Sequence, residues 1–373
     1  IIRLYKLKIL YVEPFYAGAH KQWIDNLKYF SKHDFTILSL PGRKWKWRMH
    51  GGAISLAEKF NQLDKKFDLI ICSDMLNVPV FNQLCNNNLR CSKVVVYFHE
   101  NQLSYPWSPH DEDKVLNRDF HYYYINYTSS LISDYNFFNS RYQYDSYFDE
   151  LKRYLNKMPD CKNLDSIDKI KKKSSVLHVG CNLDVNNKFS NNNSIPIVLW
   201  NHRWEYDKGP DDFFDTLYKI KKMGIKFSLV VLGEKYTEYP DCFKLAETKL
   251  KDEILYMGYC ESNKDYKNWL RKADVIPVTS IQDFFGISIV EAISYHTYPI
   301  LPNRLAYPEI MDIDSNPEIF YNSKNELYKK LLYYLKNYKK LNQSCLKYSS
   351  IVNKYSWNNI IDIYDSNFEK LLN

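Results

Sequence analysis

Short apolar segments alternate with amphipathic helical segments along almost the whole chain, and they fall into two sets. The first set predicts strands at 7–15, 35–40, 69–73, 94–99, 135–139 and 176–181, with helices between them. The second set predicts strands at 197–200, 227–232, 254–257, 275–278 and 298–301. Strands that alternate with helices favour parallel sheets covered by helices on both faces. We therefore expect an α/β protein with two doubly wound parallel sheets.

The segment between the two sets is polar, rich in asparagine and without apolar periodicity. It predicts a linker at 184–195, an N-terminal Rossmann-like domain at 1–183 and a C-terminal Rossmann-like domain at 196–355. Further helices are expected near 327–338 and 357–372, the last within a terminal segment at 356–373. A chain of 373 residues has the length of about two or three domains, which agrees with this division.

The composition is that of a globular protein, with 45% hydrophobic and 16% aromatic residues. The net charge of +7 permits a polyanionic partner without requiring one. Eight cysteines without a CxxC pair argue against a zinc site and fit the reduced thiols of a cytosolic protein. No secretory signal precedes the first strand, and no apolar run approaches the roughly 20 residues that cross a bilayer. We therefore expect a cytoplasmic protein without a membrane association.

Residues 275–297 form the most informative stretch for function. A short apolar strand leads into a loop that contains Asp283, and Gly286 then opens a helix that carries Glu291. The free N–H groups at such a helix start can bind a phosphate or a sugar hydroxyl. Both acids are expected near the mouth of one pocket. Taken alone, however, their spacing also fits two ordinary surface acids.

The loops after the other strands of the second set hold further candidates. Arg203 and Lys208 flank a short loop that leads into a helix, and together they suit a diphosphate, since arginine offers a planar fork and lysine a compact charge. The alternative is a solvated basic loop. Gly233 with Glu234, and Tyr259, follow the next two strands where a nucleoside would lie, although glycine at a strand end is usually just a turn.

In the first set, the fourth strand ends in a cluster of polar residues. A lone histidine at a strand end is more often structural, but His99 is followed directly by Glu100, Asn101 and Gln102, which favours a functional role. The first strand is followed by a turn of small residues and His20, the opening of a nucleotide-binding type of unit. With one glycine only, this turn does not match a dinucleotide fingerprint.

A basic, indole-containing loop is predicted after the second strand. Its cations and tryptophans are suited to RNA phosphates and to the stacking of unpaired bases. The alternative is a basic surface loop whose tryptophans are buried. The residues concerned are Arg43, Lys44, Trp45, Trp47 and Arg48.

The pattern of acid, seven residues and acid, with Phe-Gly after the first acid, resembles the donor signature of retaining GT-B glycosyltransferases of family 4. The resemblance implies that Asp283 binds hydroxyls of the donor sugar, that Glu291 binds the ribose, and that the turn backbone serves the sugar and the diphosphate. It implies also that Arg203 and Lys208 neutralise the leaving diphosphate without a metal ion. His99 would contact the donor sugar, while the departing phosphate takes the proton of the acceptor. The usual first acid of the family is Glu rather than Asp.

Over essentially its whole length, the chain is similar to the tRNA-queuosine mannosyltransferase family. The similarity rests on the ordered strings EPFYAGAHKQW, PGRKWKWR, YFHENQL, RDFHYYYIN, NHRWEYDKGP, DFFGISIVEA and YPEI. It implies a GT-B fold of two facing Rossmann-like domains, with a C-terminal helix that crosses back. It implies transfer of mannose from GDP-mannose, with retention, to the cyclopentene diol of queuosine at the wobble position of tRNA-Asp. The chain has Ala17-Gly18-Ala19 where the family usually has Gly-Gly-Ser.

The resemblance and the loop positions together give three sets of expected site residues, with no metal and no other cofactor. The expected catalytic residues are His99, Arg203, Lys208 and Asp283. The expected donor-binding residues are Gly18, Gly233, Glu234, Tyr259, Phe284, Phe285, Gly286, Ile287 and Glu291. The expected tRNA-binding residues are His20, Arg43, Lys44, Trp45, Trp47, Arg48, Glu100, Asn101 and Gln102.

Two other readings of the sequence remain open. One is a GT-B glycosyltransferase that acts on a lipid or polysaccharide acceptor, because a basic N-terminal domain also suits anionic membranes. The other is an RNA-binding relative that has lost its activity. A glycoside hydrolase is disfavoured, because nothing in the sequence supplies the flanking pair of carboxylates that hydrolysis requires.

Overall fold

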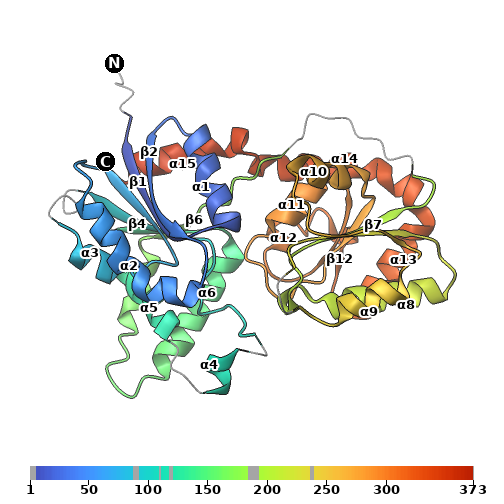
Figure 1. The fold of residues 1–373 in the computed structure, drawn as a ribbon, viewed down its shortest axis with the longest axis horizontal. Helices are drawn as coiled ribbons and strands as arrows, with labels where there is room; N and C mark the ends of the chain where they lie inside the picture. The colour runs from blue at the N-terminus through green and yellow to red at the C-terminus, as the bar shows by residue number, and fades with distance from the viewer. Residues whose placement is uncertain are drawn as a thin grey trace. The chain divides into compact units, whose positions relative to one another are not determined.

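The computed structural model describes residues 6–86, 92–108, 111–116, 121–183, 193–235 and 239–372. The chain divides into two units, Ile1–Gly180 with Trp357–Asn373 (unit 1) and Cys181–Ser356 (unit 2). Each unit contains one six-stranded sheet, and the paired strands are parallel (Figure 1). The predicted α/β class with two doubly wound parallel sheets is therefore confirmed. Residues 184–192 of the predicted linker lie outside the described residues.

The sheet of unit 1 has the strand order β2-β1-β3-β4-β5-β6. Its inner strands are apolar on both faces, as expected for strands covered by helices on both sides. The strands are β1 (Lys8–Tyr16), β2 (Asp34–Pro41), β3 (Leu69–Ser73), β4 (Lys93–Phe98), β5 (Tyr135–Phe138) and β6 (Ser174–Val176).

Helices cover both faces of this sheet (Figure 1). One face carries α1 (Gly18–Phe30) and α15 (Trp357–Lys370), which lie side by side. The predicted return of the C-terminal helix to the N-terminal unit is confirmed, because Trp23 Nε1 in α1 donates to Tyr364 Oη in α15 at 3.1 Å. Most helices of the other face share one apolar core. The remaining helices of unit 1 are α2 (Trp45–Asn61), α3 (Val78–Leu84), α4 (Glu112–Val115), α5 (His121–Ile132), α6 (Arg141–Asn156) and α7 (Asp165–Lys171).

The sheet of unit 2 has the strand order β12-β11-β10-β7-β8-β9. Its strands are β7 (Ile197–Asn201), β8 (Ser228–Leu232), β9 (Ile254–Gly258), β10 (Val275–Pro277), β11 (Tyr298–Pro302) and β12 (Phe320–Tyr321). The helices are α8 (Pro210–Lys222), α9 (Cys242–Lys249), α10 (Asn263–Lys272), α11 (Ile287–Ser294), α12 (Tyr307–Ile310), α13 (Lys324–Leu341) and α14 (Cys345–Val352). In Figure 1, α8 and α9 lie on the opposite side of the sheet from α10 and α11.

Each sheet has one point at which the strand order reverses. In unit 1 the chain runs outward from β1 to β2 and then returns to β3 on the other side of β1; in unit 2 the corresponding neighbours are β7 and β10. The loops at the carboxyl ends of such neighbouring strands diverge and leave a crevice, which is where doubly wound sheets bind ligands. The loops after β1, β3, β7 and β10 are therefore the places to look for a site.

Two local predictions from the sequence are wrong. The strand predicted at 176–181 ends at Val176, and beyond it only Cys181 makes a bridge, to Ser356. Leu177 and Val179 are nevertheless buried. The alternation of apolar residues therefore predicted correctly that this segment is buried, but burial does not require that the segment pair with a neighbouring strand.

The loop predicted at 43–48 is largely helical, since α2 begins at Trp45 after Lys44, which has a left-handed φ of 56°. Met49, Ala53 and Leu56 are buried at helical spacing further along α2. Their packing stabilises the helix, which therefore includes Trp45 and Trp47 in its first turn.

No helix of the described ranges is long and apolar enough to span a bilayer.

Candidate functional site

Lys208 lies at the centre of a polar cluster in unit 2. It ends the short turn η2 (Tyr206–Lys208) between β7 and α8, and its ammonium donates to the carbonyl of Gln282 at 2.8 Å. Its Nζ also lies 3.1 Å from Asp207 Oδ2 and 3.7 Å from Asp283 Oδ2. Burial lowers the pKa of Lys208, but the charges of Asp283 and Asp207 outweigh burial and leave this pKa raised. Lys208 is thus a charged group that joins the loops after β7 and β10.

The loop after β10 has the arrangement that the sequence predicted. Asp283 lies in the loop, and its Oδ2 accepts a hydrogen bond from Tyr307 Oη at 3.0 Å. Gly286 follows with a φ of 85°, and α11 begins at Ile287. A Cβ on Gly286 would lie 3.0 Å from the ring of Tyr307, so both backbone conformation and space favour glycine here. The start of α11 presents N–H groups that have no partner within the helix.

Glu291 belongs to the same switch point through a chain of hydrogen bonds. Its Oε2 accepts from Tyr266 Oη at 2.8 Å, and Tyr266 in turn accepts from Asn201 Nδ2, at the end of β7, at 2.9 Å. Asn201 also donates to the carbonyl of Ser288 in α11 at 2.8 Å. Burial, with the charge of Glu291, raises the pKa of Tyr266 well above its usual value, so its hydroxyl stays protonated.

Arg203 follows β7 as Lys208 does, but it lies at the surface. Its Nη2 is 3.0 Å from Glu205 Oε2, and its side chain is 46% exposed. Beside it, His202 is buried, and burial with the positive charge of Lys208 lowers the pKa of His202 to about 3. Of the predicted unit 2 residues with charge, Arg203, Lys208, Asp283 and Glu291 follow the two strands of the switch point, whereas Glu234 follows β8.

The remaining predicted donor residues of unit 2 lie close to the same strand ends. Gly233 directly follows β8 with a φ of 137°, and a Cβ there would lie 1.9 Å from the carbonyl oxygen of His202, so only glycine allows this approach. The carbonyl of Glu234 accepts from Trp204 N at 3.0 Å. Tyr259 is 55% exposed.

The aromatic pair before Gly286 contributes to the core. Phe284 and Phe285 are 6% and 2% exposed, and Phe285 packs edge-on against Tyr355. Their side chains therefore belong to the core, and the family resemblance assigns a role only to the backbone of this turn.

A second polar cluster occupies the switch point of unit 1, around the buried carboxylate of Glu13 in β1. Its Oε1 accepts from Phe15 N at 2.8 Å and from Ser73 Oγ, at the end of β3, at 3.0 Å. Its Oε2 accepts from Tyr11 Oη at 2.9 Å and lies 3.0 Å from His20 Nδ1. Four contacts to one buried side chain make Glu13 the centre of this cluster.

The two predicted histidines meet in this cluster. The rings of His20, in α1, and His99, after β4, have centroids 4.3 Å apart. His99 Nε2 lies 3.1 Å from Tyr11 Oη. Burial lowers the pKa of His20, but Glu13, then Asp74 and Glu100, raise it to about 9. Burial and the charge of His20 hold the pKa of His99 well below its usual value.

Among the described residues, the donor atoms of Glu13, His20 and His99 come within 4.8 Å of one another, close enough to surround a metal ion. Each of these residues already has a hydrogen-bond partner in the cluster, however, and the raised pKa of His20 keeps a proton on the nitrogen that faces Glu13. A metal would have to displace that proton and open the contact. We therefore interpret the cluster as a hydrogen-bond network.

The predicted tRNA-binding residues of 43–48 differ in exposure. Trp47 is 64% exposed, and Arg43 and Lys44 are exposed as well. Trp45 instead packs against Tyr122, and Arg48 donates through Nε to the carbonyl of Pro41 at 3.1 Å. The exposed edge of this segment thus consists of two cations and one indole.

The predicted residues after His99 take different roles. Gln102 Nε2 donates to Glu100 Oε1 at 3.0 Å, and both side chains are partly exposed. Asn101 is fully buried, and its Oδ1 accepts from Ser104 N at 2.9 Å, as expected of a residue that shapes a turn. Gly18 begins α1 with a φ of 51° and has open space around it.

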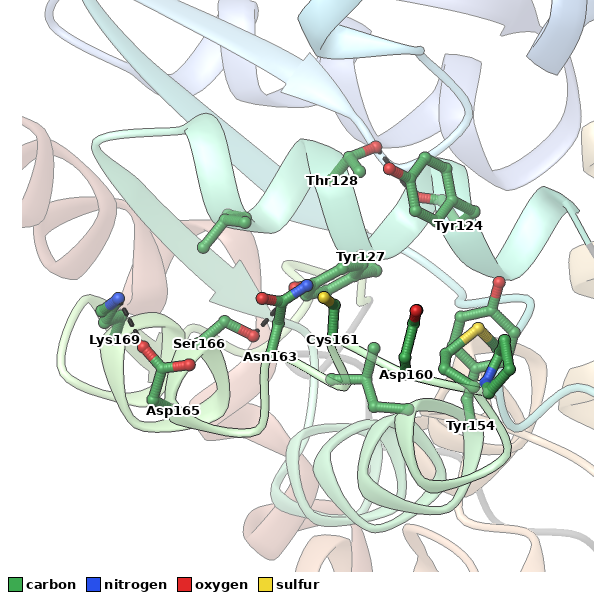
Figure 2. Close-up of a pocket in the computed structure, with 14 residues that line it drawn as sticks. Tyr124, Tyr127, Thr128, Tyr154, Asp160, Cys161, Asn163, Asp165, Ser166 and Lys169 are labelled. Carbon is green, nitrogen blue, oxygen red and sulfur yellow. Dashed lines mark hydrogen bonds and ion pairs between the residues drawn. The ribbon is translucent and has the colours of Figure 1, made fainter.

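A separate pocket of about 490 Å³ lies in unit 1, between α5, α6 and the segment that leads into α7 (Figure 2). Tyr124, Tyr127 and Tyr154 line it, and Lys169 closes one side, where it pairs with Asp165 at 2.6 Å. None of the predicted site residues lines this pocket. Two of its lining residues, Tyr127 and Ser166, are joined by a hydrogen bond between their hydroxyls at 2.9 Å.

Several residues of these clusters were missed from the sequence. Tyr11 and Glu13 lie inside the strand 7–15, where they read as part of an apolar run. The position of Glu13 inside an otherwise apolar strand was the available signal. A buried acid seldom lacks a partner, so Glu13 could have been predicted to bind other polar groups. Tyr266 and Tyr307 gave no such signal, since the chain contains 33 tyrosines.

Comparison with known protein families gives two matches that together cover most of the chain. A family model described as tRNA-queuosine alpha-mannosyltransferase N-terminal matches residues 8–181. A second, described as Glycosyl transferases group 1, matches residues 184–350. A tRNA-queuosine alpha-mannosyltransferase of Drosophila melanogaster is 34% identical over 337 residues, which cover 87% of this chain and 86% of the relative.

Solved structures with the same fold include two bacterial proteins of low sequence identity. Sucrose-phosphate synthase of Thermosynechococcus elongatus has a TM-score of 0.72 at 13% identity and covers 98% of this chain and 99% of its own. A glycosyltransferase of Rickettsia africae has a TM-score of 0.65 at 16% identity and covers 98% and 99%. These likenesses concern the fold, which is the GT-B architecture expected from the sequence.

Proposed function

Because the chain belongs to the tRNA-queuosine alpha-mannosyltransferase family, we propose that it transfers mannose from GDP-mannose to the cyclopentene diol of queuosine at the wobble position of tRNA-Asp. It is a glycosyltransferase, with a group 1 glycosyltransferase match across unit 2. The observation that carries the proposal is the position of Lys208, whose ammonium lies 2.8 Å from the carbonyl of Gln282 and 3.7 Å from Asp283. A cation and an acid thereby meet at the ligand-binding edge of the sheet.

Unit 2 is proposed to bind the donor. Lys208 and Arg203 take up the negative charge of the departing diphosphate, so that the reaction needs no metal ion. Both follow β7, and they differ in exposure: Lys208 is 10% exposed and held by three oxygen atoms, whereas Arg203 is 46% exposed and pairs with Glu205. We expect Lys208 to be a fixed charge and Arg203 a fork that closes on the phosphates.

Asp283 and Glu291 are proposed to bind the sugar and the ribose of the donor, respectively. Tyr307 and Lys208 both approach Oδ2 of Asp283, which leaves Oδ1 for a hydroxyl of mannose. Glu291, oriented by Tyr266, is assigned to the ribose. Retention follows a route in which the departing phosphate accepts the proton of the acceptor, and the protein contributes position and charge stabilisation.

Unit 1 is proposed to bind the tRNA. The exposed indole of Trp47 offers a stacking face for an unpaired base, and Arg43 and Lys44 lie beside it in the sequence as contacts for the phosphate backbone. Single-stranded loops are the usual targets of sequence-specific RNA recognition, and the anticodon loop is one. We propose in addition that the reaction takes place in the cytoplasm.

The test is a direct assay of the product. The full chain is incubated with GDP-mannose and with tRNA-Asp that either contains or lacks queuosine, and the digested nucleosides are analysed by mass spectrometry. We expect queuosine to gain the mass of one hexose in the first tRNA, and no nucleoside to change in the second. UDP-glucose serves as the control donor. Absence of the gain, or an equal gain in tRNA without queuosine, would refute the proposal.

A further inference from the structure

The hydrogen atoms of the unit 1 cluster can be assigned from its hydrogen bonds. Glu13 receives four contacts, from Phe15 N, Ser73 Oγ, Tyr11 Oη and His20 Nδ1, so it is a carboxylate that only accepts. Tyr11 has a single hydroxyl hydrogen, and it donates that hydrogen to Glu13 Oε2 at 2.9 Å. Toward other partners, the oxygen of Tyr11 can therefore only accept.

This assignment fixes the tautomer of His99. Its Nε2 lies 3.1 Å from Tyr11 Oη, which must accept, so Nε2 carries the hydrogen. His99 is neutral, because burial and the charge of His20 hold its pKa well below the usual value. In a neutral imidazole with hydrogen on Nε2, the other nitrogen, Nδ1, is a lone-pair acceptor.

His20 has the opposite character. Its Nδ1 donates to Glu13 at 3.0 Å, and its pKa, raised to about 9 against the effect of burial, keeps the ring charged at neutral pH. Its Nε2 then also carries a hydrogen. Within the described part of the chain, that Nε2 makes no hydrogen bond, and the side chain keeps 12% exposure. Glu13, Asp74 and Glu100 are the acids that face this ring.

We propose that His20 and His99 form a donor and acceptor pair that grips one hydroxyl of the substrate, and that Tyr11 and Glu13 are the positioning residues that set this pair. In this proposal a hydroxyl accepts from His20 Nε2–H and donates to His99 Nδ1, on two rings whose centroids are 4.3 Å apart. The ligand class is a sugar or cyclopentene hydroxyl. This inference rests on the proposed function only for the identity of the molecule that carries the hydroxyl.

The first experiment reads the protonation states directly. The full chain is labelled with ¹⁵N-histidine, and long-range ¹H–¹⁵N correlations are recorded from pH 6 to 10. We expect His99 to be neutral with hydrogen on Nε2, and His20 to stay doubly protonated until about pH 9. A neutral His20 at pH 7.5, a His99 with hydrogen on Nδ1, or one equivalent of bound zinc would each overturn the proposal.

The second experiment removes the positioning groups. Tyr11→Phe removes the oxygen that accepts from His99 Nε2–H. The hydrogen of His99 should then no longer be confined to Nε2, and kcat/KM should fall by about 10- to 100-fold. Glu13→Gln should move the alkaline limb of the pH profile of kcat/KM to lower pH. Tyr97→Phe is the matched control, because Tyr97 is equally buried and its ring lies 4.8 Å from His99, yet its hydroxyl bonds elsewhere. Equal effects of the Tyr11 and Tyr97 substitutions on the tautomer and on kcat/KM would refute the positioning role.

The source of the hydroxyl is decided by addition of ligands to the labelled wild-type protein. If GDP-mannose shifts the His20 and His99 resonances and GDP alone does not, the bound hydroxyl belongs to the donor sugar. A shift with queuosine nucleoside identifies the cyclopentene diol. No shift with either ligand would end the proposal. Failure of mannose transfer in the wild type would refute the proposed function, whereas the tautomers in the unliganded protein would still be measured.

Discussion

Replacement of Lys208 by methionine is expected to destabilise unit 2 by about 3–5 kcal/mol. Methionine retains most of the aliphatic volume and removes the charge. The side chain of Lys208 is 10% exposed, and those of its partners Asp207 and Asp283 are 0% and 17% exposed. Both carboxylates would then lose their nearest cation while they remain largely excluded from water.

The distances allow this magnitude to be estimated. At an effective dielectric constant of about 20, charges separated by 3.1 Å and 3.7 Å attract by about 5 and about 4.5 kcal/mol, respectively. Most of this attraction offsets the cost of burying the charges. The loss in the variant therefore comes chiefly from the carboxylates that remain without Lys208, for which removal of one partner of a buried pair typically costs about 3–5 kcal/mol.

The assay is urea unfolding followed by the fluorescence of the buried tryptophans Trp200 and Trp204, with the transitions of the two units fitted separately. With a slope of about 2 kcal/mol/M, the midpoint of unit 2 should fall by about 2 M. Adding Asp283→Asn to Lys208→Met should restore part of the loss, because it removes one of the two uncompensated charges. The control is Arg203→Met, which breaks an exposed ion pair. A loss below about 1 kcal/mol for Lys208→Met, or no recovery in the double variant, would refute the reasoning.

Four further outcomes follow from the structure. Arg203→Ala should change stability by less than about 1 kcal/mol and still reduce single-turnover mannose transfer by at least about 10-fold, as measured by rapid quench. Gly233→Ala should lower the melting temperature of unit 2, because its Cβ would lie 1.9 Å from a carbonyl oxygen and its φ is 137°. The pKa of His202 is lowered to about 3, so its neutral form contributes stability that is complete above about pH 6.5 and is lost as pH falls toward 3; His202→Gln should flatten that decline in the urea midpoint. Substitution of Arg43 and Lys44 by alanine should weaken tRNA binding and reduce the slope of log K against log salt by about 0.7 for each lost phosphate contact, and an unchanged slope would contradict the RNA assignment.

The alternation of apolar strands with helices was enough to predict both sheets except for β12, which is only two residues long. Each strand is short and local, and its apolar run follows directly from being covered on both faces. The positions of Arg203, Lys208, Asp283 and Glu291 at strand ends follow from the same alternation, because chemistry in doubly wound sheets gathers beyond the carboxyl ends of strands. The sequence therefore predicted that these four residues follow the two strands of the unit 2 switch point, and their role in binding stays a prediction.

Other features depended on contacts between distant parts of the chain. The helical start of α2 at Trp45 is fixed by packing further along the helix, and local sequence alone favoured a loop. The burial of Lys208 results from a loop more than seventy positions away, which supplies the carbonyl of Gln282. Nothing in the residues around Lys208 indicates whether its charge meets solvent or a carboxylate.

The network around Glu13 shows the same division between sequence and fold. The sequence by itself placed His99 at the carboxyl end of a central strand, where β4 ends at Phe98, and His20 at the start of the first helix, α1. Only the tertiary structure decided that the two rings lie against each other, that His99 is hydrogen-bonded to Tyr11, and that His20 is hydrogen-bonded to Glu13. The physical reason is that secondary structure is set by local periodicity, whereas a protonation state is set by the burial and charges that the whole fold brings together.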